Sequence, residues 1–477
     1  MTKREKIKQS LLAHVPKETI NQFLSRDKTP ISVLLLSCVV GVFAGLVGTL
    51  FELGVHFVTE TRTDWLKDEI GSVLPLWLLA FLISALLAFV GYFLVHKFAP
   101  EAAGSGIPEI EGAMDNMRPV RWWRVLPVKF FGGLGALGSG MVLGREGPTV
   151  QMGGNIARMV TDIFRVKNDD SRHTLLASGA AGGLAAAFNA PLAGIMFVVE
   201  EMRPHFRYSL ISIKAVLISA VTATIVFRAI NGQHAVITMP QYNSPDLQVL
   251  WLFLLLGALF GGFGVVFNRL VTVFQDLFVR IHKNDLKRFL FTGSMIGGTF
   301  GLLLLYVPEL TGGGIGLIPE ITNGSFSAQV LILLFIGRVL TTLICFGSGA
   351  PGGIFAPMLA LGTSFGYAFG LVAHTLLPEL PIEPGVFAIA GMGALFAATV
   401  RAPITGILLV IEMTNNYHLI LPLIITAVGA TIVARCLVAN LFIANFYIAQ
   451  LKTKNSSKLI YLEKSEFNHT IRCFMVT

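Results

Sequence analysis

The chain has 477 residues, of which 54% are hydrophobic and only 13% are charged, whereas soluble domains carry about 25% charged residues. This composition excludes an ordinary soluble protein and indicates a polytopic membrane protein. The formal net charge of +8 does not indicate a nucleic-acid partner, because the Lys and Arg residues lie in tails and loops, as positive-inside sorting predicts.

The first long apolar run begins only after a basic, polar segment of residues 1–30. No small-residue cleavage site follows this run, so we expect a spanning helix there and not a removed signal peptide. Crossing a bilayer takes about 20 apolar residues, and runs of sufficient length are Ile31–Val58, Leu74–Val95, Val249–Phe267, Phe289–Val307 and Val330–Phe346. Other apolar runs are too short or are interrupted by Gly and Pro.

Basic residues gather in three polar regions, and one polar connection lacks them. The three groups are Lys3, Arg4, Lys6 and Lys8, then Arg280, Lys283, Lys287 and Arg288, then Lys452, Lys454, Lys458 and Lys464. The connection Asn231–Leu247 contains no Lys or Arg. Because cytoplasmic loops carry an excess of Lys and Arg, we expect both termini inside and this connection outside. A duplicated second half would then enter the membrane inverted.

Three motifs occur twice, in the same order and roughly 210 residues apart, which indicates two homologous halves. The pairs are GSGIPEI (Gly104–Ile110) with GGGIGLIPEI (Gly312–Ile321), GSGMVLGREGP (Gly138–Pro148) with GSGAPGGIFAP (Gly347–Pro357), and APLAGIMFVVEE (Ala190–Glu201) with APITGILLVIEM (Ala402–Met413). We therefore predict an all-α polytopic membrane protein with two inverted-topology repeats of tilted, partly broken helices. The expected regions are a cytoplasmic segment 1–30, a first repeat 31–230, an external connection 231–247, a second repeat 248–448 and a cytoplasmic tail 449–477.

The differences between the two halves select candidate functional residues. Glu146 aligns with Phe355, and Glu201 aligns with Met413, so each of these acids belongs to one half only. Acids that occur once suit chemistry that is performed once per subunit. Glu200, in contrast, aligns with Glu412, which favours a structural role for Glu200.

Gly and Pro recur where several of the expected helices begin. Gly residues let the main chain turn with its N–H groups exposed, and Pro suits the first turn of a helix. These residues are Gly104, Gly106, Gly144, Gly147, Gly352 and Gly353, with Pro108, Pro148 and Pro357. Helix amino ends carry free N–H donors and partial positive charge, so converging ends would bind an anion. For most of the 49 glycines, close helix packing is the simpler interpretation.

GSGIP, GREGP and GIFAP, in that order and with the GSGAPGG run, closely resemble the signature segments of the CLC family of chloride channels and chloride/proton antiporters. The resemblance covers roughly Ile31–Arg435, and three linked motifs are far more specific than one. The short tail resembles the bacterial type. The resemblance implies a homodimer in the bacterial inner membrane, with chloride and protons as substrates, a pathway in each subunit, and no cofactor.

The resemblance also assigns roles to individual residues. It implies that the Ser105 hydroxyl and the backbone N–H groups of Ile354 and Phe355 bind a central chloride. Glu146 matches the external gating glutamate, and Glu201 matches the internal proton-transfer glutamate. The implied selectivity-filter segments are Gly104, Ser105, Gly106, Ile107 and Pro108; Gly144, Arg145, Glu146, Gly147 and Pro148; and Gly353, Ile354, Phe355, Ala356 and Pro357.

The family's tyrosine at the start of the last helix does not align with a tyrosine here. Ungapped alignment from Gly429 places Ile443 at that position, and Tyr447 lies four residues later, about one helical turn away. Either residue is a candidate for the inner end of the chloride path.

Each acid has a structural alternative to its functional role. Glu146 in a pocket of N–H groups would occupy a chloride position when ionised, or it could form a static ion pair with Arg145. Buried acids in membranes are functional by default, which favours the first interpretation. Glu201 could serve as a proton port, or it could be solvated or paired with Arg203 or Arg207.

Two other functions remain open at the level of the sequence. A passive chloride channel would have a reversal potential that ignores the pH gradient. A cation-coupled transporter for an organic anion would also use broken helices with free amino ends. The GLGALG run of Gly133–Gly138 lacks the preceding strand of a dinucleotide site, and the sequence contains no H-E-x-x-H motif of a metal-dependent hydrolase. We therefore expect neither an enzyme nor a metal site.

Overall fold

The computed structural model describes residues 31–68, 75–283 and 285–453, with side chains up to residue 439. The predicted segment 1–30 and the end of the predicted tail, 454–477, lie outside the described residues. Within the described ranges the chain is helical, apart from turns and one isolated antiparallel bridge between Gly144 and Gly353. The predicted all-α fold is confirmed.

The first repeat contains eight helices, and its last helix ends at Asn231. They are α3 (Ile31–Asp68), α4 (Leu76–Phe98), α5 (Ile107–Met114), α6 (Trp122–Gly138), α7 (Glu146–Ile163), α8 (Asp169–Phe188), α9 (Pro191–Met196) and α10 (Leu210–Asn231). A 3-10 turn, Pro100–Ala102, precedes α5, and a π-helical turn, Phe197–Glu201, extends α9.

The second repeat follows the same order of elements. Its helices are α11 (Leu250–His282), α12 (Leu286–Tyr306), α13 (Leu317–Thr322), α14 (Ala328–Gly347), α15 (Phe355–Leu376), α16 (Pro384–Val400), α17 (Pro403–Thr414) and α18 (Ile420–Thr453). The 3-10 turn Pro308–Leu310 matches the one before α5, and two more 3-10 turns, Leu247–Val249 and Tyr417–Leu419, precede α11 and α18. The one-to-one match of α3–α10 with α11–α18 supports the duplication predicted from the motifs.

Eight of the described helices are long and apolar enough to cross a membrane. Each of the five apolar runs expected from the sequence falls on one of them, namely α3, α4, α11, α12 and α14. These helices expose large apolar side chains, for example Leu86 on α4 and Leu333 on α14, as lipid contact requires. The chain is a multi-pass membrane protein.

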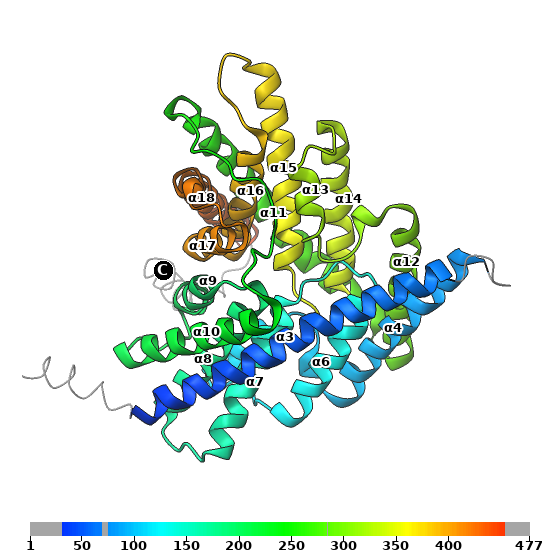
Figure 1. Ribbon diagram of the computed structural model, residues 1–477, viewed down its shortest axis with the longest axis vertical. Coiled ribbons are helices and arrows are strands. Elements are labelled where there is room, and N and C mark those ends of the chain that lie inside the picture. The colour runs from blue at the N-terminus through cyan, green and yellow to red at the C-terminus, as the bar shows by residue number, and fades with distance from the viewer. Residues whose placement is uncertain (1–30, 69–74, 284, 454–477) are drawn as a thin grey trace, which may run out of the picture.

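Equivalent helices of the two repeats meet across the centre of the molecule. α4 packs on α12, and α9 packs on α17. In Figure 1, α3–α10 occupy the lower part of the view and α13–α18 the upper part, while α12 lies beside α4. Such pairing of equivalent elements is what a pseudo-two-fold axis between inverted repeats produces.

Glycines allow close helix packing in both repeats at matching positions. A Cβ atom on Gly153 of α7 would lie 2.1 Å from the carbonyl oxygen of Gly179 on α8. The equivalent pair in the second repeat is Gly362 of α15 and Gly391 of α16, where the same distance is 2.4 Å. The packing interpretation of the glycines therefore holds for these four residues.

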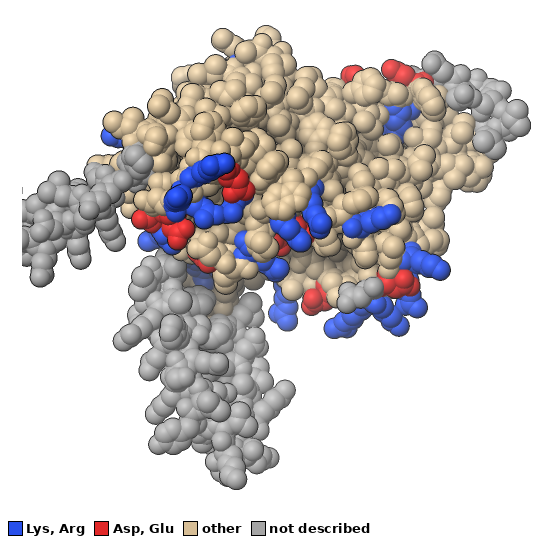
Figure 2. Space-filling view, turned by 90° about the horizontal axis from the view of Figure 1, so that it is seen from below, with Lys and Arg blue, Asp and Glu red and all other residues tan. Residues whose placement is uncertain are grey.

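Charged side chains are concentrated on part of one face of the molecule. Figure 2 shows Lys and Arg gathered there among a smaller number of Asp and Glu, while other residues form most of the visible surface. Because a polar face of this kind cannot contact lipid tails, it marks one membrane–water boundary.

Candidate functional site

Two of the predicted filter segments, GREGP and GIFAP, meet at the only bridge in the described chain. The Gly144 N–H donates to the Gly353 carbonyl at 2.8 Å, and the Gly353 N–H donates to the Gly144 carbonyl at 2.7 Å. The two glycines occupy equivalent positions in the two repeats. This contact therefore sets the starts of α7 and α15, at Glu146 and Phe355, against each other.

The Glu146 side chain is fully buried and lies at the amino end of α15. Its Oε1 atom accepts a hydrogen bond of 2.6 Å from the Phe355 backbone N–H, while Oε2 has no partner among the described residues. A free helix amino end is suited to hold an anion. The carboxylate thus occupies one of the two amide positions that the family resemblance assigns to chloride.

The bare backbone of the bridge makes room for this carboxylate. A Cβ atom on Gly144 would lie 2.1 Å from Glu146 Oε2, and one on Gly353 would lie 2.2 Å from Oε1. Any larger residue at either position would displace the Glu146 side chain. Glycine is required at these two positions because a side chain would not fit. Its backbone freedom is not the reason, since neither residue has a positive φ.

We expect Gly144→Ala to move the Glu146 carboxylate out of its position and to raise chloride flux at high pH while fewer protons move per chloride. The nearest atoms to the new Cβ are the end of a flexible side chain, so the fold can accommodate it. Flux through liposomes would be measured with a chloride electrode and a pH electrode. The matched control is Gly316→Ala, where the Cβ would meet nothing within 4 Å; wild-type coupling in both variants would contradict the expectation.

Ser105 and Phe355 flank this position from opposite repeats. A Cβ atom on Gly147 would lie 2.6 Å from Ser105 Oγ and 2.7 Å from the Ser105 carbonyl oxygen, so the GSGIP loop rests on the first turn of α7. Ile354 is the residue before α15 and is partly exposed. The Phe355 ring packs edge-on against Phe197 and Phe396, which fixes the direction of the first turn of α15.

Two buried cations that the sequence analysis missed hold the irregular loops. Lys129 of α6 is fully buried and donates to the carbonyl oxygens of Ala102 (3.0 Å) and Gly104 (2.6 Å). Arg338, the equivalent residue of α14, donates to the carbonyl oxygens of residues 309, 311 and 312 at 2.6, 3.2 and 2.9 Å. Both side chains therefore bind main-chain carbonyl oxygens of the loops that precede α5 and α13. A charged residue inside an apolar helix, repeated in both halves, was the signal for them.

Arg145 does not pair with its neighbour Glu146. Its guanidinium forms an ion pair with Glu52 of α3 and donates to the Ala187 carbonyl at 3.0 Å. Asn231, at the end of α10, donates to the other Glu52 oxygen at 3.2 Å. The static Arg145–Glu146 ion pair considered from the sequence is therefore wrong, and no side chain that the structure describes forms an ion pair with Glu146.

Glu200 and Glu412 have equivalent structural roles, as their alignment predicts. Glu412 accepts from the Leu192 and Ala193 N–H groups at 3.1 and 2.9 Å, at the amino end of α9. Glu200 accepts from the Ile404 and Thr405 N–H groups at 3.1 and 2.7 Å, at the amino end of α17. Each repeat thus caps a helix of the other with a carboxylate.

Glu201, the next residue, aligns with no carboxylate in the second repeat, and it does not cap a helix among the described residues. It ends the π-helical turn that follows α9, a local geometry that often occurs at functional sites. Burial raises the pKa of Glu201, the negative charges of Glu111 and Glu200 raise it further, and Arg401 lowers it. Arg207 pairs instead with Asp170 at 2.7 Å, so the suggested Glu201–Arg207 pair is wrong.

A family model described as "Voltage gated chloride channel" matches residues 87–435, about three quarters of the chain. This chain belongs to that family, the CLC family. The resemblance of the GSGIP, GREGP and GIFAP motifs is thereby confirmed.

Curated CLC relatives are similar to almost the whole chain. A Vibrio parahaemolyticus protein named "H(+)/Cl(-) exchange transporter ClcA" is 81% identical over 435 residues, which cover 91% of this chain and 93% of that protein. A Yersinia pseudotuberculosis protein of the same name is 60% identical and covers 87% of each chain. The crystal structure of a slow cyanobacterial Cl−/H+ antiporter has a TM-score of 0.81 and 43% identity, covering 85% of this chain and 94% of that one.

The inner end of the CLC pathway is not described. Ile443 and Tyr447 both fall within α18, but their side chains lie outside the described residues. Their assignment to chloride binding stays a prediction. The GLGALG run lies inside α6, and no strand precedes it among the described residues, so it lacks the context of a dinucleotide site.

Proposed function

We propose that the chain is a proton-coupled chloride transporter, an H+/Cl− antiporter of the bacterial inner membrane. We further propose that it is a homodimer in lipid with one pathway per subunit, and that both termini are cytoplasmic. The observation that carries the proposal is the hydrogen bond from the Phe355 N–H to the Glu146 carboxylate, a side chain held where an anion would bind.

The exchange follows from competition between two anions for the same donors. An ionised Glu146 fills the space beside the Gly144–Gly353 bridge and blocks the path. Protonation removes its charge, weakens its hold on the Phe355 N–H, and frees that donor for chloride. Because the site accepts either the carboxylate or chloride, inward chloride movement and outward proton movement alternate.

Chloride binding in this proposal uses polar groups without a full positive charge. The Ser105 hydroxyl and the Ile354 and Phe355 N–H groups would surround the ion, and Lys129 and Arg338 bind main-chain carbonyl oxygens of the loops that precede α5 and α13. A site of oriented dipoles holds chloride weakly enough to release it. Either Ile443 or Tyr447 would complete the site from α18.

Protons need a second carboxylate to reach the other side of the membrane. Glu201 is the candidate, because the neighbouring Glu200 already has a structural role and Glu201 does not. A passive channel does not require a second residue for proton transfer, so the presence of Glu201 favours antiport over passive conduction. The relatives named as H(+)/Cl(-) exchange transporters support the same choice.

The test is proton movement in liposomes loaded with the full-length protein. With a chloride gradient as the sole driving force and no sodium present, we expect proton movement against its own gradient, slowed when bromide or nitrate competes. Chloride flux without proton movement would indicate a passive channel. Flux that requires sodium, or that ignores competing halide, would indicate an organic-anion transporter.

A further inference from the structure

A cavity of about 560 Å³ shares no lining residue with the anion position described above. Its wall is formed by the end of α5, the α5–α6 connection, the end of α7, the start of α8 and the α9–α10 connection. The wall carries five cationic side chains, all of them arginine, against two aspartates. The arginines are Arg118, Arg121, Arg158, Arg172 and Arg207.

The acids near the cavity leave many arginine N–H groups available. Arg158 pairs with Asp162 at 3.0 Å and Arg207 with Asp170 at 2.7 Å, but the Arg172–Asp169 distance is 4.0 Å. The remaining two arginines pair with glutamates that do not line the cavity, Arg121 with Glu101 at 2.8 Å and Arg118 with Glu109 at 4.0 Å. A guanidinium has five N–H donors, and exposed ion pairs of this kind contribute little free energy. A stronger anion can therefore compete for them.

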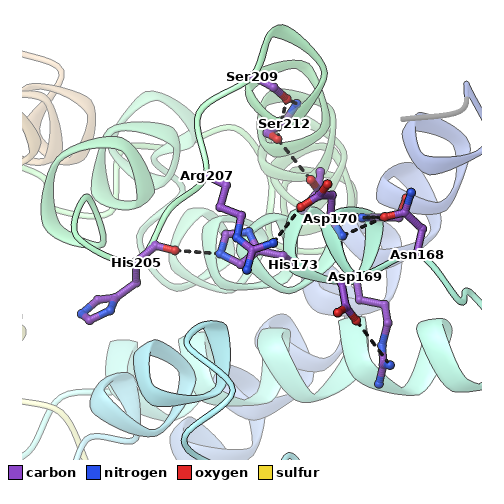
Figure 3. A network of polar contacts seen from close by, with 11 residues as sticks. Asn168, Asp169, Asp170, His173, His205, Arg207, Ser209 and Ser212 are labelled. Carbon is purple, nitrogen blue, oxygen red and sulfur yellow. Dashed lines mark hydrogen bonds and ion pairs between the residues drawn. The ribbon is translucent and has the colours of Figure 1, made fainter. Parts of the chain in front are cut away.

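A buried histidine in the wall has an unused nitrogen atom. His173 of α8 is 6% exposed; its Nε2 lies 2.7 Å from the His205 carbonyl oxygen, and its Nδ1 has no partner among the described residues. Figure 3 shows the His173 ring reaching the α9–α10 connection beside Arg207. Because Nε2 must donate to the carbonyl, Nδ1 is an acceptor in the neutral ring and becomes a donor only when protonated.

The surroundings of His173 make this nitrogen sensitive to an anion. Burial lowers the pKa of His173 and Arg207 lowers it further, whereas the His205 carbonyl, Asp170 and Asp115 raise it. An anion in the cavity would add a favourable partner for the protonated ring and would raise the pKa. By linkage, the anion must then bind more tightly as the pH falls through the pKa of the ring.

We propose that this cavity is a second anion site that takes a phosphate group. Guanidinium groups match phosphate oxygens in bidentate geometry, whereas Lys is a point charge, and the cavity is much larger than a chloride ion requires. The phosphate could belong to a soluble phosphate compound or to a lipid headgroup. Trp123, which also lines the cavity and is 57% exposed, has the character of a membrane-interface residue.

The site lies next to the candidate proton port. The α9–α10 connection begins directly after Glu201, and its His205 contacts Asp115 at 2.6 Å. Glu111 interacts electrostatically with both His205 and Glu201. A ligand that holds this connection in place is expected to change the exchange rate. This effect on the rate rests on the proposed function, whereas the binding of the ligand does not depend on it.

Binding is tested on the full chain in nanodiscs of phosphatidylcholine, with pyrophosphate as the soluble probe at constant chloride and ionic strength. Pyrophosphate itself loses negative charge as the pH falls, so the wild type is compared with His173→Asn at each pH. We expect pyrophosphate to raise the unfolding temperature of the wild type more than that of His173→Asn at about pH 6, and equally in both at about pH 8, where an unperturbed His is neutral. Arg172→Gln and Arg207→Gln should each weaken binding about tenfold or more, as charged hydrogen bonds imply. Arg280→Gln, an exposed arginine outside the cavity, is the matched control.

Two further arms identify the source of the phosphate and the role of the histidine. His173→Asn should keep arginine-dependent binding but lose the additional stabilisation that the wild type shows at about pH 6. If phosphatidic acid in the nanodisc raises the unfolding temperature and pyrophosphate does not, the ligand is a lipid headgroup. A rise that is equal in Arg207→Gln, Arg172→Gln and Arg280→Gln, or no rise with either probe, overturns the proposal and leaves the transport function untouched.

Discussion

Glu146→Ala is expected to abolish chloride-driven proton movement while chloride flux remains measurable and becomes independent of pH. The substitution removes the carboxylate that accepts from the Phe355 N–H, so chloride can hold this donor at any pH and no group remains to carry the proton. Loss of a positioned acid–base group costs about 10²-fold or more. Parallel chloride-electrode and pH-electrode recordings from the same liposomes measure both effects.

Glu146→Gln provides the comparison for Glu146→Ala. Gln has the shape of the protonated acid but cannot ionise, so it should also lose proton movement while retaining some obstruction of the path. Chloride flux should therefore be slower with Gln than with Ala. Proton movement at the wild-type rate in either variant would contradict the role of Glu146.

Glu201→Gln should also remove proton movement, by about 10²-fold or more if the group acts as an acid–base relay. Its chloride flux should keep the pH dependence of the wild type, because Glu146 still opens and closes the path from the other side. This difference separates the two acids: Glu146→Ala flux ignores pH, and Glu201→Gln flux follows it. A pH titration of chloride flux in both variants measures the difference.

Glu412→Gln is the matched control for Glu201→Gln. It makes the same chemical change in a carboxylate that caps α9, and Gln keeps one acceptor oxygen for the Leu192 and Ala193 N–H groups. We expect a lower unfolding temperature, from a loss of about 1–2 kcal/mol, with coupling intact. Should Glu412→Gln lose coupling as completely as Glu201→Gln, the loss would reflect damage to the helix caps.

The duplication could be predicted from the sequence because it rests on motifs that tolerate little change. At Gly144 and Gly353 an added Cβ atom would overlap the Glu146 carboxylate, so both halves have glycine at this position. The starts of α5, α7 and α15 near Pro108, Pro148 and Pro357 were predicted for the same reason, since Pro lacks an N–H and fits the first turn.

The contacts between the repeats could not be predicted in this way. The sequence placed Arg145 next to Glu146, but the partner of Arg145 is Glu52, about 90 residues away on a different helix. Lys129 and Arg338 bind main-chain carbonyl oxygens. Because every residue has such an oxygen, the residue types do not show which one a side chain will contact. The arginine cavity could not be predicted from the sequence either, because its lining residues come from four separate segments of the chain.

The Gly144–Gly353 bridge has a consequence for the origin of the molecule. In an ancestor with two identical halves, residues 146 and 355 would have been the same amino acid, facing each other across the axis. Two glutamates there would place two negative charges side by side, and two phenylalanines would provide no titratable group. Under the proposed function, a single titratable group at this pair therefore requires that the two halves differ here, as they do at Glu146 and Phe355.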